Sequence, residues 1–144
     1  MKKYPVRDEH EELYFSSLRE KSGYERITAV REGIPYYAFE RFAASSFISM
    51  ADWAELLEIS ERSLQRYKKE NKSFDRMRSE RIIEIEAVLR KGVDVFGDEE
   101  KFFTWMNSKI LALGGIKPRE LLDSSIGIEI INDELTAIEY GIFA

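Results

Sequence analysis

Cationic and amide side chains gather in one short segment of the chain, residues 61–72, where they are suited to contact a nucleic acid. The six candidates are Arg62, Gln65, Arg66, Lys68, Lys69 and Lys72. Arginine pairs with guanine, and glutamine with adenine, through two hydrogen bonds each, so the arginines and the glutamine are the expected base-reading residues. The lysines are expected to touch phosphates, which raises affinity at low salt without reading sequence. The alternative is a solvated basic face, because helix surfaces are commonly rich in lysine and arginine.

These side chains need a helix that presents them, and the local pattern predicts a helix-turn-helix. Ser49 and Ser60 each stand where a hydroxyl would cap the start of a short helix. Ala54 supplies a small residue where the two helices approach most closely, while Leu64 and Tyr67 supply the inward face of the second helix. The second helix is therefore the one expected to enter a DNA major groove.

The predicted turn departs from the usual pattern at one residue. Glu58 stands where glycine is usual, and Ile59 fills the apolar position of the turn. Two outcomes are open at Glu58. The backbone takes a different connection, or the residue is left-handed at a cost on the order of 1 kcal/mol.

Apolar periodicity predicts further helices on both sides of this motif. Before it, helices are expected over residues 8–21, with a stop at Gly23, over 24–32, and from Pro35 onward. After it, a longer helix carrying Ile82 to Leu89 is expected to end near Gly92.

The remaining third of the chain reads as a separate helical unit. Asp98 is expected to start one helix, Gly114 and Gly115 to form a loop, and Pro118 to start a further helix. Residues 126–131 are β-branched enough for a strand, but the apolar spacing that runs on to Ile142 favours a helix.

Composition indicates a folded protein without catalytic chemistry. The 144 residues include nine Phe, seven Tyr and two Trp, too many large apolar side chains for a chain that is disordered by composition. Cysteine is absent and His10 is the only histidine, which leaves no disulfide, no thiolate zinc site and no plausible catalytic triad. Paired acids at 99–100 and 133–134 suit helix starts better than acid–base work. No enzyme activity, metal or cofactor is expected.

The N-terminus lacks the apolar stretch of a signal peptide, and no run of about 18 apolar residues occurs. No contact with a membrane is therefore expected, and the expected location is the cytoplasm.

The net charge of −5 is unevenly distributed along the chain. Residues 60–91 hold ten Lys or Arg against six Asp or Glu, whereas residues 92–144 hold four against ten. Because the distribution of charge matters more than its total, the first segment is suited to phosphate and the second to a basic protein.

Three stretches in the last third resemble one family. They are 95–106, with VFGD and FFTWM; 113–122, LGGIKPRELL; and 138–144, IEYGIFA. In this order they resemble the toxin-binding domain of Xre/MbcA/ParS antitoxins, and the segment before them resembles that family's helix-turn-helix domain. The family often has a hydroxyl residue before the proline; here Lys117 stands there, so the helix cap must come from elsewhere or be absent.

The resemblance implies an all-α protein, a helix-turn-helix bundle followed by a small helical toxin-binding domain. The expected division is an N-terminal arm over 1–22, a helix-turn-helix domain over 23–91 and a toxin-binding domain over 92–144. The implied partner is a toxin of the RES fold that consumes NAD, with the C-terminal domain covering its active-site cleft. Candidate contacts are Trp105, Gly114, Gly115, Pro118, Tyr140, Gly141, Ile142, Phe143 and Ala144. The alternative for Trp105, Tyr140, Ile142 and Phe143 is packing within their own domain.

The resulting hypothesis is a dual-role antitoxin. One unit inhibits the toxin in a hetero-oligomer, and the other represses the shared operon by binding operator DNA as a homodimer, because two recognition helices read paired half-sites. The alternatives are a stand-alone transcription regulator whose C-terminal domain dimerises, and an antitoxin that no longer binds DNA.

Overall fold

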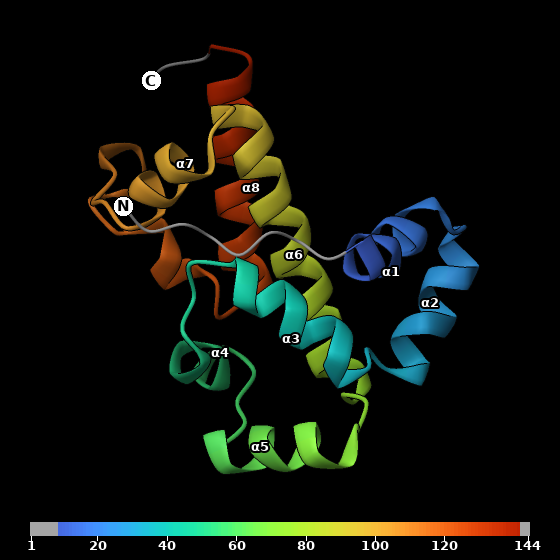
Figure 1. Cartoon of the computed structure of the whole chain (residues 1–144). Coiled ribbons are helices and arrows are strands. Elements are labelled where there is room, and N and C mark those ends of the chain that lie inside the picture. The colour runs from blue at the N-terminus through green and yellow to red at the C-terminus, as the bar shows by residue number, and fades with distance from the viewer. Residues whose placement is uncertain (1–8, 142–144) are drawn as a thin grey trace. The chain divides into compact units, whose positions relative to one another are not determined.

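The computed structural model describes the backbone of residues 9–141 and the side chains of residues 14–141. The described residues form eight α-helices and two short 3-10 helices, with isolated bridges but no named strand (Figure 1). The α-helices are α1 (Glu9–Glu20), α2 (Gly23–Glu32), α3 (Tyr36–Ser45), α4 (Met50–Leu56), α5 (Glu61–Glu70), α6 (Arg76–Phe96), α7 (Glu99–Met106) and α8 (Ser125–Glu139), and the 3-10 helices are η1 (Leu111–Leu113) and η2 (Pro118–Leu121). The all-α prediction is confirmed. Within the described residues, no helix combines the length and the apolar character needed to span a bilayer.

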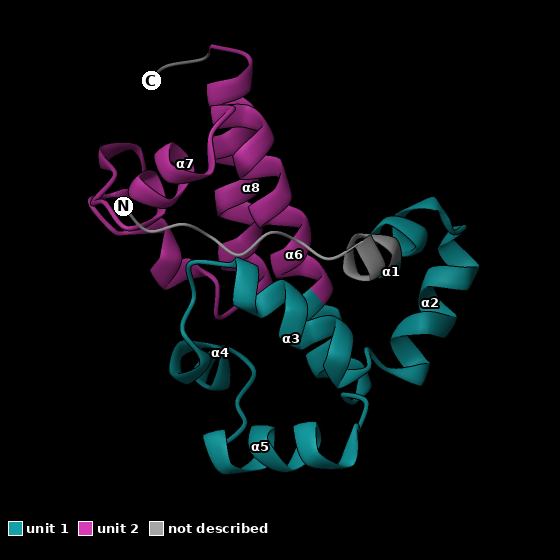
Figure 2. Cartoon of the chain, viewed as in Figure 1, with its two compact units in different colours: residues 1–82 teal, residues 83–144 magenta. Residues whose placement is uncertain are grey.

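The chain divides into two compact units, residues 1–82 and residues 83–144, here called the N-terminal unit and the C-terminal unit (Figure 2). The division falls inside α6, which contributes its first turns to one unit and the rest to the other. The predicted division after residue 91 also lies within α6.

The N-terminal unit is built around an aromatic core. Phe39, Trp53 and Phe74 are almost completely buried. Their rings meet edge to face, with centroids 5.2 Å apart for Phe39 and Trp53 and 5.1 Å apart for Phe39 and Phe74. Aromatic pairs prefer this edge-to-face arrangement. The three rings therefore pack α3, α4 and the segment before α6 against one another.

The C-terminal unit packs α8 alongside the second part of α6. Ser125 Oγ donates to Glu84 Oε1 at 3.1 Å, and Lys91 Nζ donates to the backbone oxygen of Asn132 at 3.3 Å and to Thr136. Residue numbers rise together on both helices between these contacts, so the two helices run parallel, as Figure 1 shows. Helix α7 completes the core with Phe102 and Met106, both fully buried.

The predicted end of the long helix near Gly92 is wrong. Helix α6 continues to Phe96, and the chain turns at Gly97, which has a φ of 72°. At Gly92, inside this helix, the ring of Phe102 occupies the space where a Cβ would be, with its Cε1 only 2.0 Å from that position. The glycine therefore leaves room for the buried ring and does not end the helix.

Two other helix boundaries differ from the predictions. Gly23 does not end the first helix but begins α2, where Ser22 and Glu25 form a capping box. The segment that begins at Pro118 is a 3-10 helix, and Lys117 supplies no side-chain cap. The expected helix over 126–142 is confirmed as α8 over most of its length, although it ends at Glu139, and Ile142 lies outside the described residues.

Candidate functional site

Two serine caps and one left-handed residue shape the helix-turn-helix of the N-terminal unit. Ser49 Oγ accepts from the backbone N–H of Asp52 at 3.1 Å, and Ser60 Oγ accepts from that of Ser63 at 3.0 Å, so both predicted caps are confirmed. Between them Glu58 has a φ of 53°, the left-handed alternative of the two left open by the sequence. The tight turn is therefore made without glycine, at a backbone cost on the order of 1 kcal/mol.

Arg78, in the first turn of α6, holds this turn in place. Its guanidinium donates to the backbone oxygens of Leu57 and Glu58, each at 2.7 Å, and pairs with Asp75. Partial burial pulls the pKa of Asp75 upward, but hydrogen bonds from the Arg78 backbone and guanidinium, together with its charge, outweigh burial and lower that pKa. The clamp fixes the carbonyl groups of a strained turn and so fixes the start of α5.

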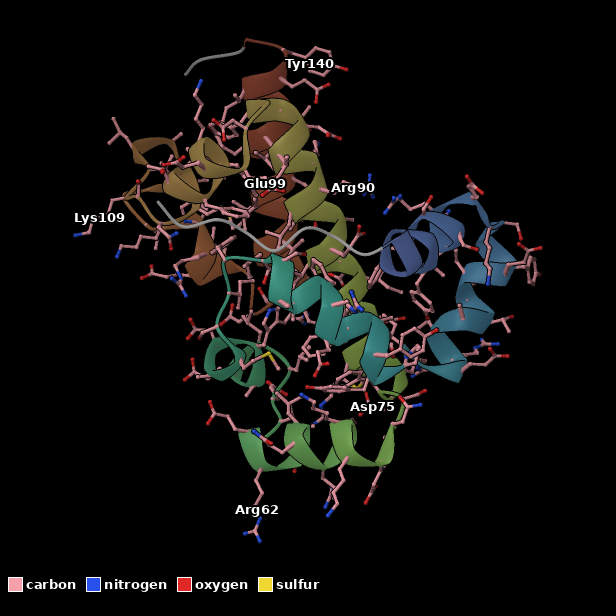
Figure 3. The ribbon with its side chains drawn as sticks, viewed as in Figure 1. Arg62, Asp75, Arg90, Glu99, Lys109 and Tyr140 are labelled. Atoms are coloured by element: carbon pink, nitrogen blue, oxygen red, sulfur yellow. The ribbon has the colours of Figure 1, made fainter. Side chains whose placement is uncertain are left out.

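Helix α5 presents a polar stripe to solvent. Leu64 and Tyr67 are buried, as predicted, and pack α5 onto its own unit. The exposed stripe comprises Arg62, Gln65, Arg66 and Lys69. The last three lie three, four and seven residues after Arg62, so all four share one face. Figure 3 shows Arg62 extending away from the ribbon. With Ser63 and Lys68 these side chains line a shallow hollow on the surface of α5. The stripe combines both side-chain types needed for base reading on one helix.

Two of the predicted phosphate contacts lie beside this stripe. Lys68 Nζ is 3.2 Å from Glu40 Oε2 on α3, and the two side chains are 63% and 40% exposed. Lys72 Nζ lies 5.0 Å from the centre of the Tyr67 ring, within cation–π range. The structure therefore brings four predicted DNA contacts onto one face and holds the other two against neighbouring side chains.

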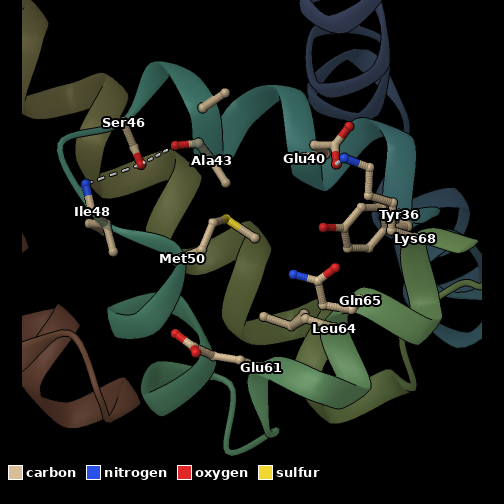
Figure 4. Close-up of a pocket in the computed structure, with 11 residues that line it drawn as sticks. Tyr36, Glu40, Ala43, Ser46, Ile48, Met50, Glu61, Leu64, Gln65 and Lys68 are labelled. Atoms are coloured by element: carbon tan, nitrogen blue, oxygen red, sulfur yellow. Dashed lines mark hydrogen bonds and ion pairs between the residues drawn. The ribbon is translucent and has the colours of Figure 1, made fainter.

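A pocket of about 420 Å³ lies between α3, α4 and α5 (Figure 4). Tyr36, Glu40 and Lys68 line one side of it, and Met50 and Leu64 line another. Burial, followed by the charge of Glu40 and a hydrogen bond with it, raises the pKa of Tyr36 to about 12. Tyr36 therefore stays protonated and uncharged at neutral pH.

In the C-terminal unit, two predicted contact residues take part in the unit's own packing. Pro118 is buried at the start of η2. Trp105 is half-buried, and its ring centroid lies 5.6 Å from that of Phe96 and 6.2 Å from that of Phe102. Gly114 and Gly115 are exposed instead, in a turn closed by hydrogen bonds between Ile110 and residues 115 and 116.

Tyr140 and Gly141 lie exposed at the end of α8. Tyr140 is 71% exposed, and Gly141 has a φ of 69°. The last three candidates, Ile142, Phe143 and Ala144, lie outside the described residues.

Sequence reasoning missed an apolar surface on α8. Ile126 and Ile130 are 73% and 42% exposed, whereas Ile131 and Leu135 on the same helix are completely buried. Ile126, Ile130, half-buried Ala137 and Tyr140 share one helical face, here called the α8 stripe. The signal was present in the sequence as a second set of residues at spacings of four, seven and three, offset from the buried set.

The tip of the turn before η2 carries another missed apolar residue. Leu111 is 92% exposed. It begins η1, and the N–H of Gly114 donates to its backbone oxygen at 2.9 Å, so the side chain stands on an ordered turn.

Comparison with known families and proteins adds to this geometry. Residues 25–86 match the antitoxin Xre-like helix-turn-helix domain, and residues 91–141 match the antitoxin Xre/MbcA/ParS C-terminal toxin-binding domain. The chain is 36% identical over 119 residues to a Yersinia enterocolitica protein named antitoxin Xre, covering 82% of this chain and 80% of that protein. It is 23% identical over 139 residues to a Sphingobium protein named Prs ADP-ribosylating antitoxin, covering 90% of this chain and 87% of that protein.

Proposed function

Because this chain belongs to the Xre antitoxin family, with its helix-turn-helix and toxin-binding domains, we propose that it neutralises a RES-type, NAD-consuming toxin and represses its own operon. In this proposal the C-terminal unit covers the active-site cleft of the toxin. The name of the Sphingobium relative supports the NAD chemistry, since ADP-ribosylation draws its ADP-ribose from NAD. The protein itself acts by binding, without catalysis.

The observation that carries the toxin-binding role is the set of exposed apolar side chains on α8. The α8 stripe exposes Ile126, Ile130 and Tyr140, with the exposed Asp133 on the same face. In the sequence, Ile142 and Phe143 follow Tyr140. An apolar side chain that moves from water into a partner gains roughly 1.5–3 kcal/mol, so this surface can supply most of an interface core. The other predicted contacts then divide by position: Gly114 and Gly115 shape the nearby turn, while Trp105 and Pro118 hold the unit's fold.

Co-expression with the product of the neighbouring gene tests this role. A chain that ends at Glu139 should lose the stable complex and the rescue of growth, and Ile130→Asp should weaken both because it places a charge in the α8 stripe. Leu111→Asp is the control, a charge on an exposed apolar residue of η1, outside that stripe. Full neutralisation by the truncated chain, with circular dichroism showing it folded, would refute the proposed surface.

The DNA-binding role is carried by the exposed stripe of α5. We expect Arg62, Gln65 and Arg66 to read bases, and Lys68, Lys69 and Lys72 to approach phosphates, from two copies of the chain on paired half-sites. Mobility shifts on the DNA upstream of the gene, at 50 and 200 mM salt, test this. Over that range the expected loss of affinity is about twelvefold for two neutralised phosphates and about fortyfold for three. Arg66→Ala should relax sequence preference, and affinity that does not change with salt would contradict the phosphate contacts.

The α8 stripe also favours a second candidate, a stand-alone regulator that dimerises through its C-terminal unit. An exposed apolar helix face is equally suited to a second copy of the same chain. Sedimentation of the purified protein separates the two roles. If Ile130→Asp converts a dimer to a monomer and leaves neutralisation unchanged, the regulator is favoured; if it leaves the mass unchanged and weakens neutralisation, the antitoxin surface is favoured.

A further inference from the structure

Lys68 differs from the other predicted DNA contacts in having an acidic partner. Among the six, it is the one whose ammonium forms an ion pair within the described residues, with Glu40 Oε2 at 3.2 Å. The contact joins α3 to α5 across the rim of the pocket in Figure 4, where the two side chains lie next to each other. Because 63% of Lys68 and 40% of Glu40 are exposed, the pair is screened by water and can open.

Glu40 lies one helical turn after Tyr36 on α3. Its charge helps to raise the pKa of the tyrosine. Tyr36 is buried and fixed by packing against Phe39 and Phe74. The acid thus stands on a helix that is packed into the core, while Lys68 is a long side chain whose head can move.

A carboxylate and a DNA phosphate are competing acceptors for the same ammonium group. While Lys68 is paired with Glu40, it cannot neutralise a phosphate, and Glu40 adds a negative charge beside the helix that must approach the DNA. Both effects lower the affinity for DNA and leave the base-reading stripe untouched.

We propose that Glu40 is an intramolecular competitor that holds Lys68 back from the DNA backbone and keeps operator affinity below the value that α5 could reach. The inference rests on the proposed DNA-binding function and adds a residue on α3 that sets the affinity. In chemical terms, Glu40 takes the place of one phosphate, and while the pair is closed Lys68 makes no contact with the DNA backbone.

The test is a double-mutant cycle on the full chain, measured as binding to the DNA upstream of the gene at several salt concentrations. Glu40→Gln should raise affinity by about threefold to tenfold at 50 mM salt and steepen the slope of log K against log salt by about 0.9, one additional phosphate contact. Lys68→Gln should change little in the wild-type background but should cancel the gain in the Glu40→Gln background.

Glu70→Gln is the matched control, since it removes the same charge from an exposed acid on α5 itself. An equal gain from Glu70→Gln would show an effect of net charge and overturn the inference, as would an unchanged salt slope for Glu40→Gln. Those outcomes leave the proposed DNA binding intact. If the wild type and every variant fail to bind the DNA at any salt, the DNA-binding function is refuted, and the competitor role with it.

Discussion

Because the ring of Phe102 lies against Gly92, we expect Gly92→Ala to destabilise the protein, although helix propensity alone would predict a gain in stability. Gly92 lies inside α6, where replacement by alanine would ordinarily stabilise a helix by about 1 kcal/mol. A Cβ at this position would lie 2.0 Å from Phe102 Cε1 and 2.1 Å from Cζ. Carbon atoms pack best at about 3.5–4.0 Å, so the fully buried ring would have to move by more than an ångström.

Such overpacking costs about 3 kcal/mol, the upper end of the usual range, because the displaced ring is in the core of the unit. After the gain in helix propensity, Gly92→Ala should lower the free energy of unfolding of the C-terminal unit by about 2 kcal/mol, a Tm decrease of roughly 8–16 °C for a unit of this size. Scanning calorimetry or thermal circular dichroism measures this change.

Two further variants make the reasoning refutable. Gly23 begins α2 and has nothing within 4 Å of its would-be Cβ, so Gly23→Ala should leave stability unchanged or slightly raised. Phe102→Leu should cost less in the Gly92→Ala background than alone, because the smaller side chain relieves the overlap. A Gly92→Ala protein that is more stable than wild type would show that propensity prevails and that the packing argument is wrong.

Three other perturbations concern the N-terminal unit. Glu58→Gly should raise stability in urea by about 0.5–1 kcal/mol, because glycine takes the left-handed backbone without strain, whereas Glu58→Ala should give no such gain. Arg78→Ala should destabilise the unit by about 2 kcal/mol, since two charge-assisted hydrogen bonds to the turn are lost and part of that loss is recovered by water. Tyr36, with a pKa raised to about 12, contributes stability below pH 10 that is lost as the pH rises through 12, so Tyr36→Phe should flatten the alkaline decrease in Tm.

The parts of the fold that the sequence predicts well are those determined by residues close together in the chain. The caps at Ser49 and Ser60, and the buried pair Leu64 and Tyr67, depend on residues within a few positions of one another. Helix α8 was likewise recognisable from its spacing, despite its β-branched residues. In each case the deciding interaction is local, so the pattern carries it.

The errors and omissions arise where a distant residue decides. Gly92 has the sequence signature of a helix end, but the residue makes room for the ring of Phe102, from the next helix, and residues near Gly92 in the sequence do not show this. Lys68 resembles its neighbours in the sequence, and only Glu40, from α3, sets it apart. Packing and pairing across the fold are not visible as periodicity, so the candidate DNA contacts could be found as a group but not ranked.

The same reasoning explains why the net charge of −5 is a poor guide to what the chain can bind. The surplus of acids over bases lies mainly in residues 92–144, where ten Asp or Glu stand against four Lys or Arg, while α5 exposes Arg62, Arg66 and Lys69 on one face with the neutral Gln65 between them. Acids on other elements act on a bound phosphate only within about a Debye length, roughly 8 Å at physiological salt. The acid that matters most is therefore the one that contacts the basic helix directly. If Glu40 holds Lys68, one well-placed carboxylate influences DNA affinity more than the surplus of acids elsewhere in the sequence.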